Sequence, residues 1–183
     1  MQEIREVNRK LGVNFVKAGA EVDILADGRL DLDDELLEQL DWVTASIHSG
    51  FNHDNTERII RACENPFVHC IGHPTGRLIG TREGYEVDLQ KVIAAAADTG
   101  TALEINAQPQ RMDLDEKWAR AAKEKGVKLV ISTDSHQSAN FAFMKLGVFI
   151  ARRAWCTADD ILNTHSWKDV HAFAQKKKEL VAA

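Results

Sequence analysis

Short apolar runs alternate with longer stretches of helical periodicity along this chain. The apolar runs are residues 13–24, 42–47, 67–72, 101–106 and 127–132. Between them, residues 55–63, 88–97 and 113–125 have the pattern of amphipathic helices. Strands that alternate with helices predict parallel pairing, because each helix carries the chain back across the sheet. The pattern therefore predicts an α/β fold with about five parallel strands and flanking helices, as a sheet or part of a barrel.

Capping and turn residues mark where several of these helices begin and end. Residues 1–11 are charged and predict a helix that Gly12 terminates. Asp88 stands at the N-cap of the helix over 88–97, and Gly100 follows its C-terminal end. Asp113-x-x-Glu116 has the spacing of a capping box, which predicts that the next helix starts there.

Imidazoles and carboxylates recur at or near the ends of the apolar runs. Glu21 lies in the first run, His48 and His73 close the next two, and Asp134-Ser135-His136 follows the last. Parallel strands that end at one rim are how barrel enzymes gather their functional groups, and this mixture of ligands suits Zn²⁺, Mn²⁺ or Fe²⁺. A histidine taken alone is more often a hydrogen-bonded core or rim residue than a metal ligand. Their repetition at matching positions favours a metal site formed by Glu21, His48, His73, Asp134 and His136.

Three further residues are candidates for supporting roles. Glu104 and Asn106 alternate within one apolar run, so they share a face of the predicted strand and could orient the metal ligands. A buried, satisfied polar pair is an equally good interpretation of them. Arg77 follows His73 on a loop rich in glycine and arginine, where its guanidinium could grip a phosphate. For a single arginine such as Arg77, a solvated surface charge is the more common role.

Composition narrows the class of protein. The chain has 183 residues and a net charge of −5, so no overall basic field attracts nucleic acid. Its three cysteines are scattered without a Cys-x-x-Cys pair, which predicts reduced thiols and a cytoplasmic location. No apolar run approaches the length of a membrane span, so we expect no membrane partner. Neither a Gly-rich phosphate loop nor the spacing of a nucleophilic triad competes with the metal site.

Several strings of the sequence resemble the PHP family, the polymerase and histidinol phosphatase domains. The likeness is closest to the domain at the C-terminal end of bacterial family X DNA polymerases, and it covers nearly the whole chain. The strings are Ala20-Glu21-Val22-Asp23-Ile24-Leu25, Ser46-Ile47-His48-Ser49, Gly72-His73-Pro74-Thr75-Gly76-Arg77, Leu103-Glu104-Ile105-Asn106-Ala107, Ser132-Thr133-Asp134-Ser135-His136 and Ala151-Arg152-Arg153-Ala154-Trp155. The string around His73 is the most specific of them.

The resemblance implies a distorted seven-stranded (β/α) barrel that holds up to three divalent ions, Mn or Zn, and hydrolyses phosphoesters. In the polymerase subgroup the activity resembles a 3′–5′ exonuclease or a 3′-phosphatase, with DNA 3′ ends as the partner. By this likeness Glu21 would bridge two metals and His48 and His73 would complete one of them. Asp134 and His136 would serve the other positions.

The sequence departs from the family pattern at its start. The family opens with a strand bearing His-x-His and a second strand ending in Thr-Asp-His, and neither motif occurs here. We therefore expect residues 1–183 to form a single PHP domain that lacks its first two βα units, and we expect this fragment on its own to be nearly inactive. Two alternatives remain open. One is a small-molecule phosphatase of the histidinol-phosphatase type acting on a phosphorylated small molecule, and the other is a truncated, non-catalytic metal-binding module.

Overall fold

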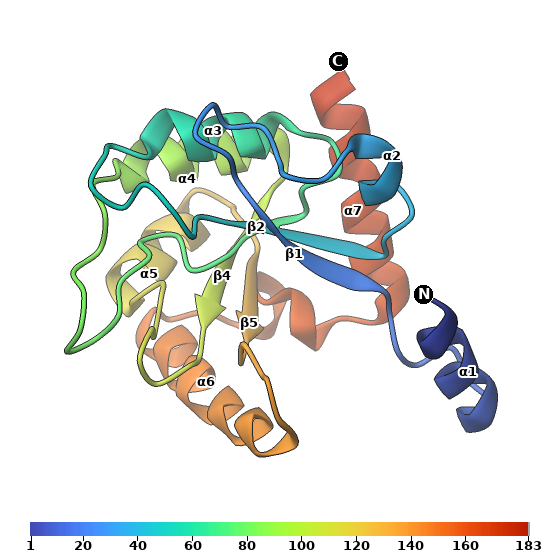
Figure 1. Ribbon diagram of the computed structural model, residues 1–183. Helices are drawn as coiled ribbons and strands as arrows, with labels where there is room; N and C mark the ends of the chain where they lie inside the picture. The colour runs from blue at the N-terminus through green and yellow to red at the C-terminus, as the bar shows by residue number, and fades with distance from the viewer. Residues whose placement is uncertain (183) are drawn as a thin grey trace.

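A sheet of five parallel strands lies at the centre of the computed structural model, which describes residues 1–182 (Figure 1). The strands are β1 (Gly19–Asp23), β2 (Trp42–Ser46), β3 (Cys70–Ile71), β4 (Ala102–Asn106) and β5 (Leu129–Ser132), and they lie side by side in chain order. The helices are α1 (Gln2–Leu11), α2 (Asp34–Leu37), α3 (Thr56–Glu64), α4 (Leu89–Thr99), α5 (Glu116–Glu124), α6 (Met144–Arg153) and α7 (Trp167–Ala182), with short 3₁₀ turns η1 (Ser138–Phe143), η2 (Ala158–Asp160) and η3 (Leu162–Thr164). The predicted α/β class is confirmed, and the arrangement is consistent with a partial β/α barrel.

The two faces of the sheet differ in polarity because side chains alternate along each strand. One face is apolar and packs against the helices in the main core, with Val22, Ala45, Ile71, Ile105 and Ile131 among its members. On the opposite face the strand register aligns polar side chains instead, namely Glu21, Ser46, Glu104, Asn106 and Ser132. The polar face is therefore where the strands offer functional groups.

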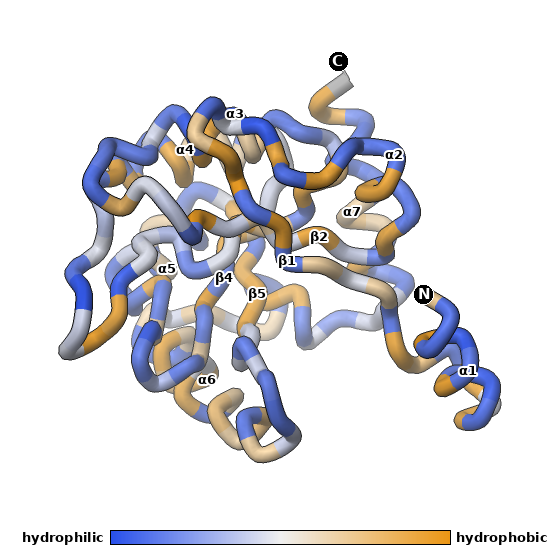
Figure 2. Tube along the Cα trace, viewed as in Figure 1, coloured by the Kyte–Doolittle hydropathy of each residue, from blue (hydrophilic) through white to orange (hydrophobic). Residues whose placement is uncertain are grey.

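Local chemistry explains both ends of α4. The Asp88 carboxylate accepts hydrogen bonds from the backbone N–H groups of Gln90 and Lys91, and Gly100 ends α4 in the left-handed conformation with φ of 67°. Helix α1 ends in the same way at Gly12, but it has no buried residue, stands apart from the sheet in Figure 1 and is mainly hydrophilic in Figure 2. Within residues 1–182, none of the helices is both long enough and apolar enough to cross a bilayer.

The structure corrects several of the predicted boundaries, and β3 occupies only Cys70–Ile71 of the predicted 67–72. Strand β1 occupies only Gly19–Asp23 of the predicted 13–24, since the Asn8 side chain takes the backbone groups of Val16 as hydrogen-bond partners. Helix α5 starts at Glu116 with Asp115 as its N-cap, so the predicted capping box is wrong. Asp113 is buried instead, and its carboxylate accepts hydrogen bonds from the backbone of Thr75 and Gly76.

Candidate metal centre

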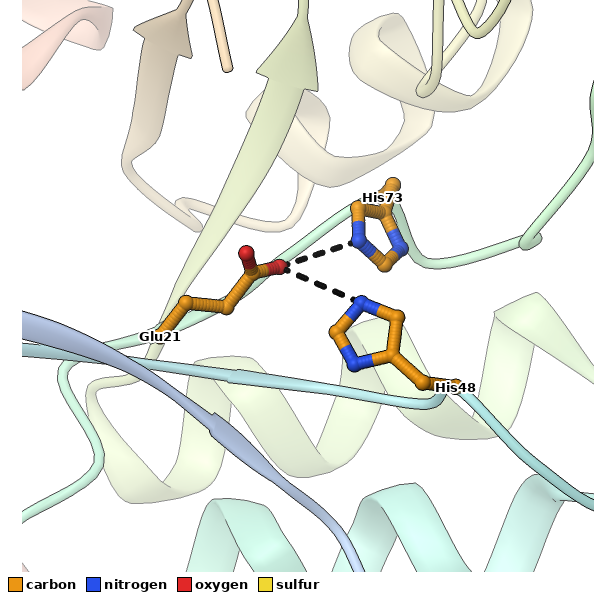
Figure 3. A group of neighbouring side chains, drawn as sticks. All are labelled: Glu21, His48 and His73. Atoms are coloured by element: carbon orange, nitrogen blue, oxygen red, sulfur yellow. Dashed lines mark hydrogen bonds and ion pairs between the residues drawn. The ribbon is translucent and has the colours of Figure 1, made fainter. Parts of the chain in front are cut away.

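Three of the predicted ligands meet at the carboxyl ends of consecutive strands. Glu21 lies in β1, and His48 and His73 each follow the last residue of their strand, β2 and β3, by two positions. The Glu21 Oε1 atom lies 3.0 Å from His73 Nε2 and 3.7 Å from His48 Nε2 (Figure 3). One donor atom from each of the three residues falls within 4.8 Å of the others. Parallel pairing brings them together, because strands that run in one direction end at one edge.

Two neighbours that the sequence pattern did not assign to the site orient these ligands. Asp23 Oδ1 lies 2.6 Å from His48 Nδ1, and the Ser46 hydroxyl donates to Glu21 Oε1 at 2.6 Å. In the tautomer that carries its proton on Nδ1, His48 donates to Asp23 and presents Nε2 towards Glu21. The signal for Asp23 was its alternation with Glu21 in one strand, which places both on the same side of the sheet.

Glu104 and Asn106 lie beside this centre and hold its backbone. His73 takes the unusual φ of 27°, and its backbone N–H donates to Glu104 Oε2 at 2.5 Å. Glu104 also accepts from the Ser132 hydroxyl and, at 3.2 Å, from the amide of Asn106. Both residues are buried and satisfied, so they have the contacts of supporting residues. Their influence on the ligands remains a prediction.

His73 affects the charges of Glu21 and Glu104, and both carboxylates affect the charge of His73. The hydrogen bond from His73, acting against burial, lowers the pKa of Glu21 to about 2. Burial opposes a charge on His73, but the hydrogen bond to Glu21 and the nearby Glu104 more than offset it and raise the pKa of His73. Burial raises the pKa of Glu104, although the charge of His73 opposes the shift. A centre with this excess of carboxylates stabilises positive charge.

Asp134 and His136 lie outside the three-residue group. Asp134 Oδ2 is 3.4 Å from the Asn106 amide and 3.2 Å from Arg111 Nε, while the His136 side chain is 85% exposed and its Nδ1 lies 2.9 Å from the Asp134 carbonyl oxygen. Within residues 1–182, only Glu21, His48 and His73 form a group of three with donor atoms close enough for one ion. The role of Asp134 and His136 as ligands stays a prediction.

Arg77 is engaged with the backbone of a neighbouring turn. Its Nε donates to the Arg111 carbonyl oxygen at 2.9 Å and its Nη2 to that of Met112, and Nη1 lies 3.8 Å from the Asp115 carboxylate. Arg111 itself, which no sequence motif marked, reaches the site through Asp134. The predicted contact of Arg77 with substrate remains untested.

The residues present fit a divalent cation. A carboxylate and two imidazoles within 4.8 Å match the donor set of catalytic Zn²⁺ and related ions, which combine two or three such side chains with an open position. The Asp23–His48 contact is the carboxylate–histidine arrangement that commonly supports a metal ligand. A parallel β/α sheet with such donors at the carboxyl ends of its strands is the arrangement in which β/α barrel enzymes gather their functional groups.

Comparison with known proteins places the chain more narrowly. It is 46% identical to the DNA polymerase/3′-5′ exonuclease PolX of Bacillus subtilis over 178 residues, which is 96% of this chain and 31% of PolX. It is 34% identical to a probable phosphatase of a Thermoanaerobacter species over 182 residues, which is 92% of this chain and 71% of the phosphatase. A probable phosphatase of Syntrophotalea carbinolica is 41% identical over 101 residues. No family model matches the chain.

These relatives and the fold confirm the family. The chain belongs to the polymerase and histidinol phosphatase (PHP) family, a family of hydrolases. It spans 31% of the length of PolX, so it corresponds to one part of that polymerase.

Proposed function

We propose that this chain carries the metal-dependent phosphoesterase centre of a family X DNA polymerase and cleaves phosphoester bonds at DNA 3′ ends. The observation that carries the proposal is the cluster of Glu21, His48 and His73 at the carboxyl ends of three adjacent strands. The 46% identity to PolX over almost the whole chain supports the DNA substrate. Reduced cysteines, of which Cys63 and Cys70 are buried and free, agree with a cytoplasmic protein.

Each side chain of the centre would have a separate role in holding the cation. Glu21 is ionised over the whole physiological range and supplies a carboxylate to the centre. His48 is aimed by Asp23, and His73 is held by its backbone contact with Glu104. A bound divalent cation, Mn²⁺ or Zn²⁺, would supply the positive charge that stabilises a phosphoryl group and activates water. In this proposal Asp134 and His136 serve further cations, up to three in a complete domain.

The test is the Mn²⁺-dependent release of nucleotides from the 3′ end of a DNA primer. It is run on this chain and on the complete coding sequence in which the chain occurs, because the chain spans only part of PolX. We expect H48A and H73A each to reduce the rate by about a hundredfold or more, since each removes one cation donor. H171A is the matched control, because His171 lies exposed on α7 outside the cluster. The proposal fails if the complete protein releases no nucleotide, or if the two site variants match the control.

A small-molecule phosphatase is the second candidate. The identity with a probable phosphatase favours it, because the chain spans 71% of that protein's length. Steady-state rates on histidinol phosphate and on a DNA 3′ end distinguish the two candidates, since the metal donors would be shared. Hydrolysis of neither substrate, combined with fewer than two tightly bound metals per chain in elemental analysis, would identify a non-catalytic metal-binding module.

A further inference from the structure

Arg111 presents an incompletely used guanidinium at the edge of the metal centre. Its Nε lies 3.2 Å from Asp134 Oδ2, and both side chains are largely buried, at 17% and 18% exposure. Within residues 1–182, Nη1 and Nη2 of Arg111 have no hydrogen-bond partner. A guanidinium has five N–H donors, so four of those of Arg111 remain available to a ligand.

Arg111 is connected to the cation donors by a short series of contacts. Glu21 Oε1 forms a hydrogen bond with His73 Nε2, and the His73 backbone N–H donates to Glu104 Oε2. The Asn106 amide then bridges Glu104 Oε2 and Asp134 Oδ2, at 3.2 Å and 3.4 Å. The positive charge of Arg111 acts against protonation of His73, which places the guanidinium within electrostatic reach of the centre. Arg111 is therefore linked to the candidate cation donor His73 through Asp134, Asn106 and Glu104.

Arg77 fixes the backbone from which Arg111 projects. The turn over residues 108–112 is closed by the Arg111 N–H bonding the Gln108 carbonyl oxygen at 2.8 Å, and Met112 has a φ of 45°. Arg77 donates to the carbonyl oxygens of both Arg111 and Met112. The two arginines thus differ in availability, because Arg77 is committed to main-chain oxygens and Arg111 is held by a single carboxylate.

We propose that Arg111 alternates between two anions, the Asp134 carboxylate and the phosphate group of the substrate. A divalent cation that binds Asp134 repels the guanidinium and neutralises its partner, which releases Arg111. The freed fork then binds the phosphate with two parallel N–H bonds, for which a guanidinium is well shaped. Cation loading therefore prepares phosphate binding. This inference rests on the proposed phosphoesterase function.

The test measures two affinities in wild-type protein and R111Q. Isothermal titration with MnCl₂ reports cation binding, and titration with inorganic phosphate at saturating Mn²⁺ reports anion binding. We expect R111Q to bind Mn²⁺ about threefold or more tightly, because Asp134 loses a competing cation, and to bind phosphate about tenfold more weakly. R152Q is the matched control, since Arg152 is exposed at the end of α6, and it should change neither affinity.

The two affinities must change together if Arg111 alternates between its anions. Weaker phosphate binding without tighter Mn²⁺ binding would overturn the alternation, and so would tighter Mn²⁺ binding with unchanged phosphate affinity. If R111Q loses its circular dichroism signal, R111K replaces it, and that variant should keep Mn²⁺ binding at the wild-type level but lose several-fold in phosphate affinity because the fork is absent. Wild-type protein that binds no Mn²⁺ contradicts the proposed function itself, whereas a difference between wild type and R111Q bears only on Arg111.

Discussion

At the residue scale, the orientation of His48 depends on one carboxylate. Asp23 Oδ1 approaches His48 Nδ1 to 2.6 Å, and the opposite ring nitrogen faces Glu21. A ring that is held at one nitrogen presents the other with little loss of rotational freedom, and its basicity increases. Asp23 therefore contributes to the centre by directing the His48 ring.

Replacing Asp23 by Asn should weaken cation binding without unfolding the protein. The amide cannot supply the charged acceptor for the His48 Nδ1 proton, so we expect D23N to lose about ten- to a hundredfold in Mn²⁺ affinity, measured by isothermal titration. D33N is the control, because Asp33 is exposed and its side chain caps no backbone group of α2. Equal Mn²⁺ affinities in D23N and D33N would contradict this role for Asp23.

At the element scale, two aspartates near the start of α5 have different hydrogen-bonding roles. Asp115 caps the helix by accepting from the Trp118 N–H at 3.0 Å. Asp113, two residues earlier, is buried and accepts from the Thr75 and Gly76 N–H groups at 2.9 Å and 3.0 Å. Asp113 thus ties the loop that follows His73 to the loop that follows β4. The position of the His73 loop depends on this tie.

These assignments predict different costs for two alanine variants. D115A loses one helix cap and should reduce the free energy of unfolding by about 1 kcal/mol. D113A removes the acceptor of the buried Gly76 N–H and of the partly buried Thr75 N–H, and it should cost about 2–5 kcal/mol. Urea denaturation followed by circular dichroism measures both. A D113A protein as stable as D115A would show that the loop tie contributes little.

At the scale of the whole molecule, a buried lysine joins the C-terminal helix to the sheet and its helices. Lys177 on α7 is fully buried, and its Nζ donates to the Cys63 carbonyl oxygen at the end of α3 and to the Thr101 hydroxyl, both at 2.6 Å. It has no carboxylate partner in these contacts. Burial lowers the pKa of Lys177 to about 8.

This shift makes stability depend on pH with a definite sign. Between pH 8 and about 10.5, unfolded chains keep the Lys177 proton and folded chains lose it, so raising the pH favours folding by up to about 3 kcal/mol. The Cys63 thiol, whose pKa burial raises to about 12, acts in the opposite direction. The prediction therefore concerns the difference in the free energy of unfolding between wild type and K177M. Both proteins contain Cys63, so its contribution cancels in this difference.

We expect the free energy of unfolding of wild type, minus that of K177M, to rise as the pH increases from 8 to 10. Urea denaturation at several pH values measures it. A difference that stays constant across this range would mean that Lys177 keeps its proton in the folded protein.

Much of the architecture was accessible from the pattern of the chain. The alternation of apolar runs with helical periodicity predicted the parallel α/β order, because burial of a strand and of one helix face imposes different periods on the sequence. Positions of His48 and His73 after their strands also followed from this pattern. The family resemblance was carried by contiguous strings such as Gly72-His73-Pro74, which need no tertiary information.

The contacts between these segments were decided only by the tertiary structure. Two examples depend on how loops from separate βα units meet. One is the choice of Asp23 as the carboxylate that orients His48, and the other is the binding of Arg77 to the carbonyl oxygens of Arg111 and Met112. The true cap of α5 also emerged there, since the Thr75–Gly76 loop competes for Asp113. Local sequence sets the period and the ends of each element, whereas side-chain partners far apart in the chain are chosen by the packing of the folded whole.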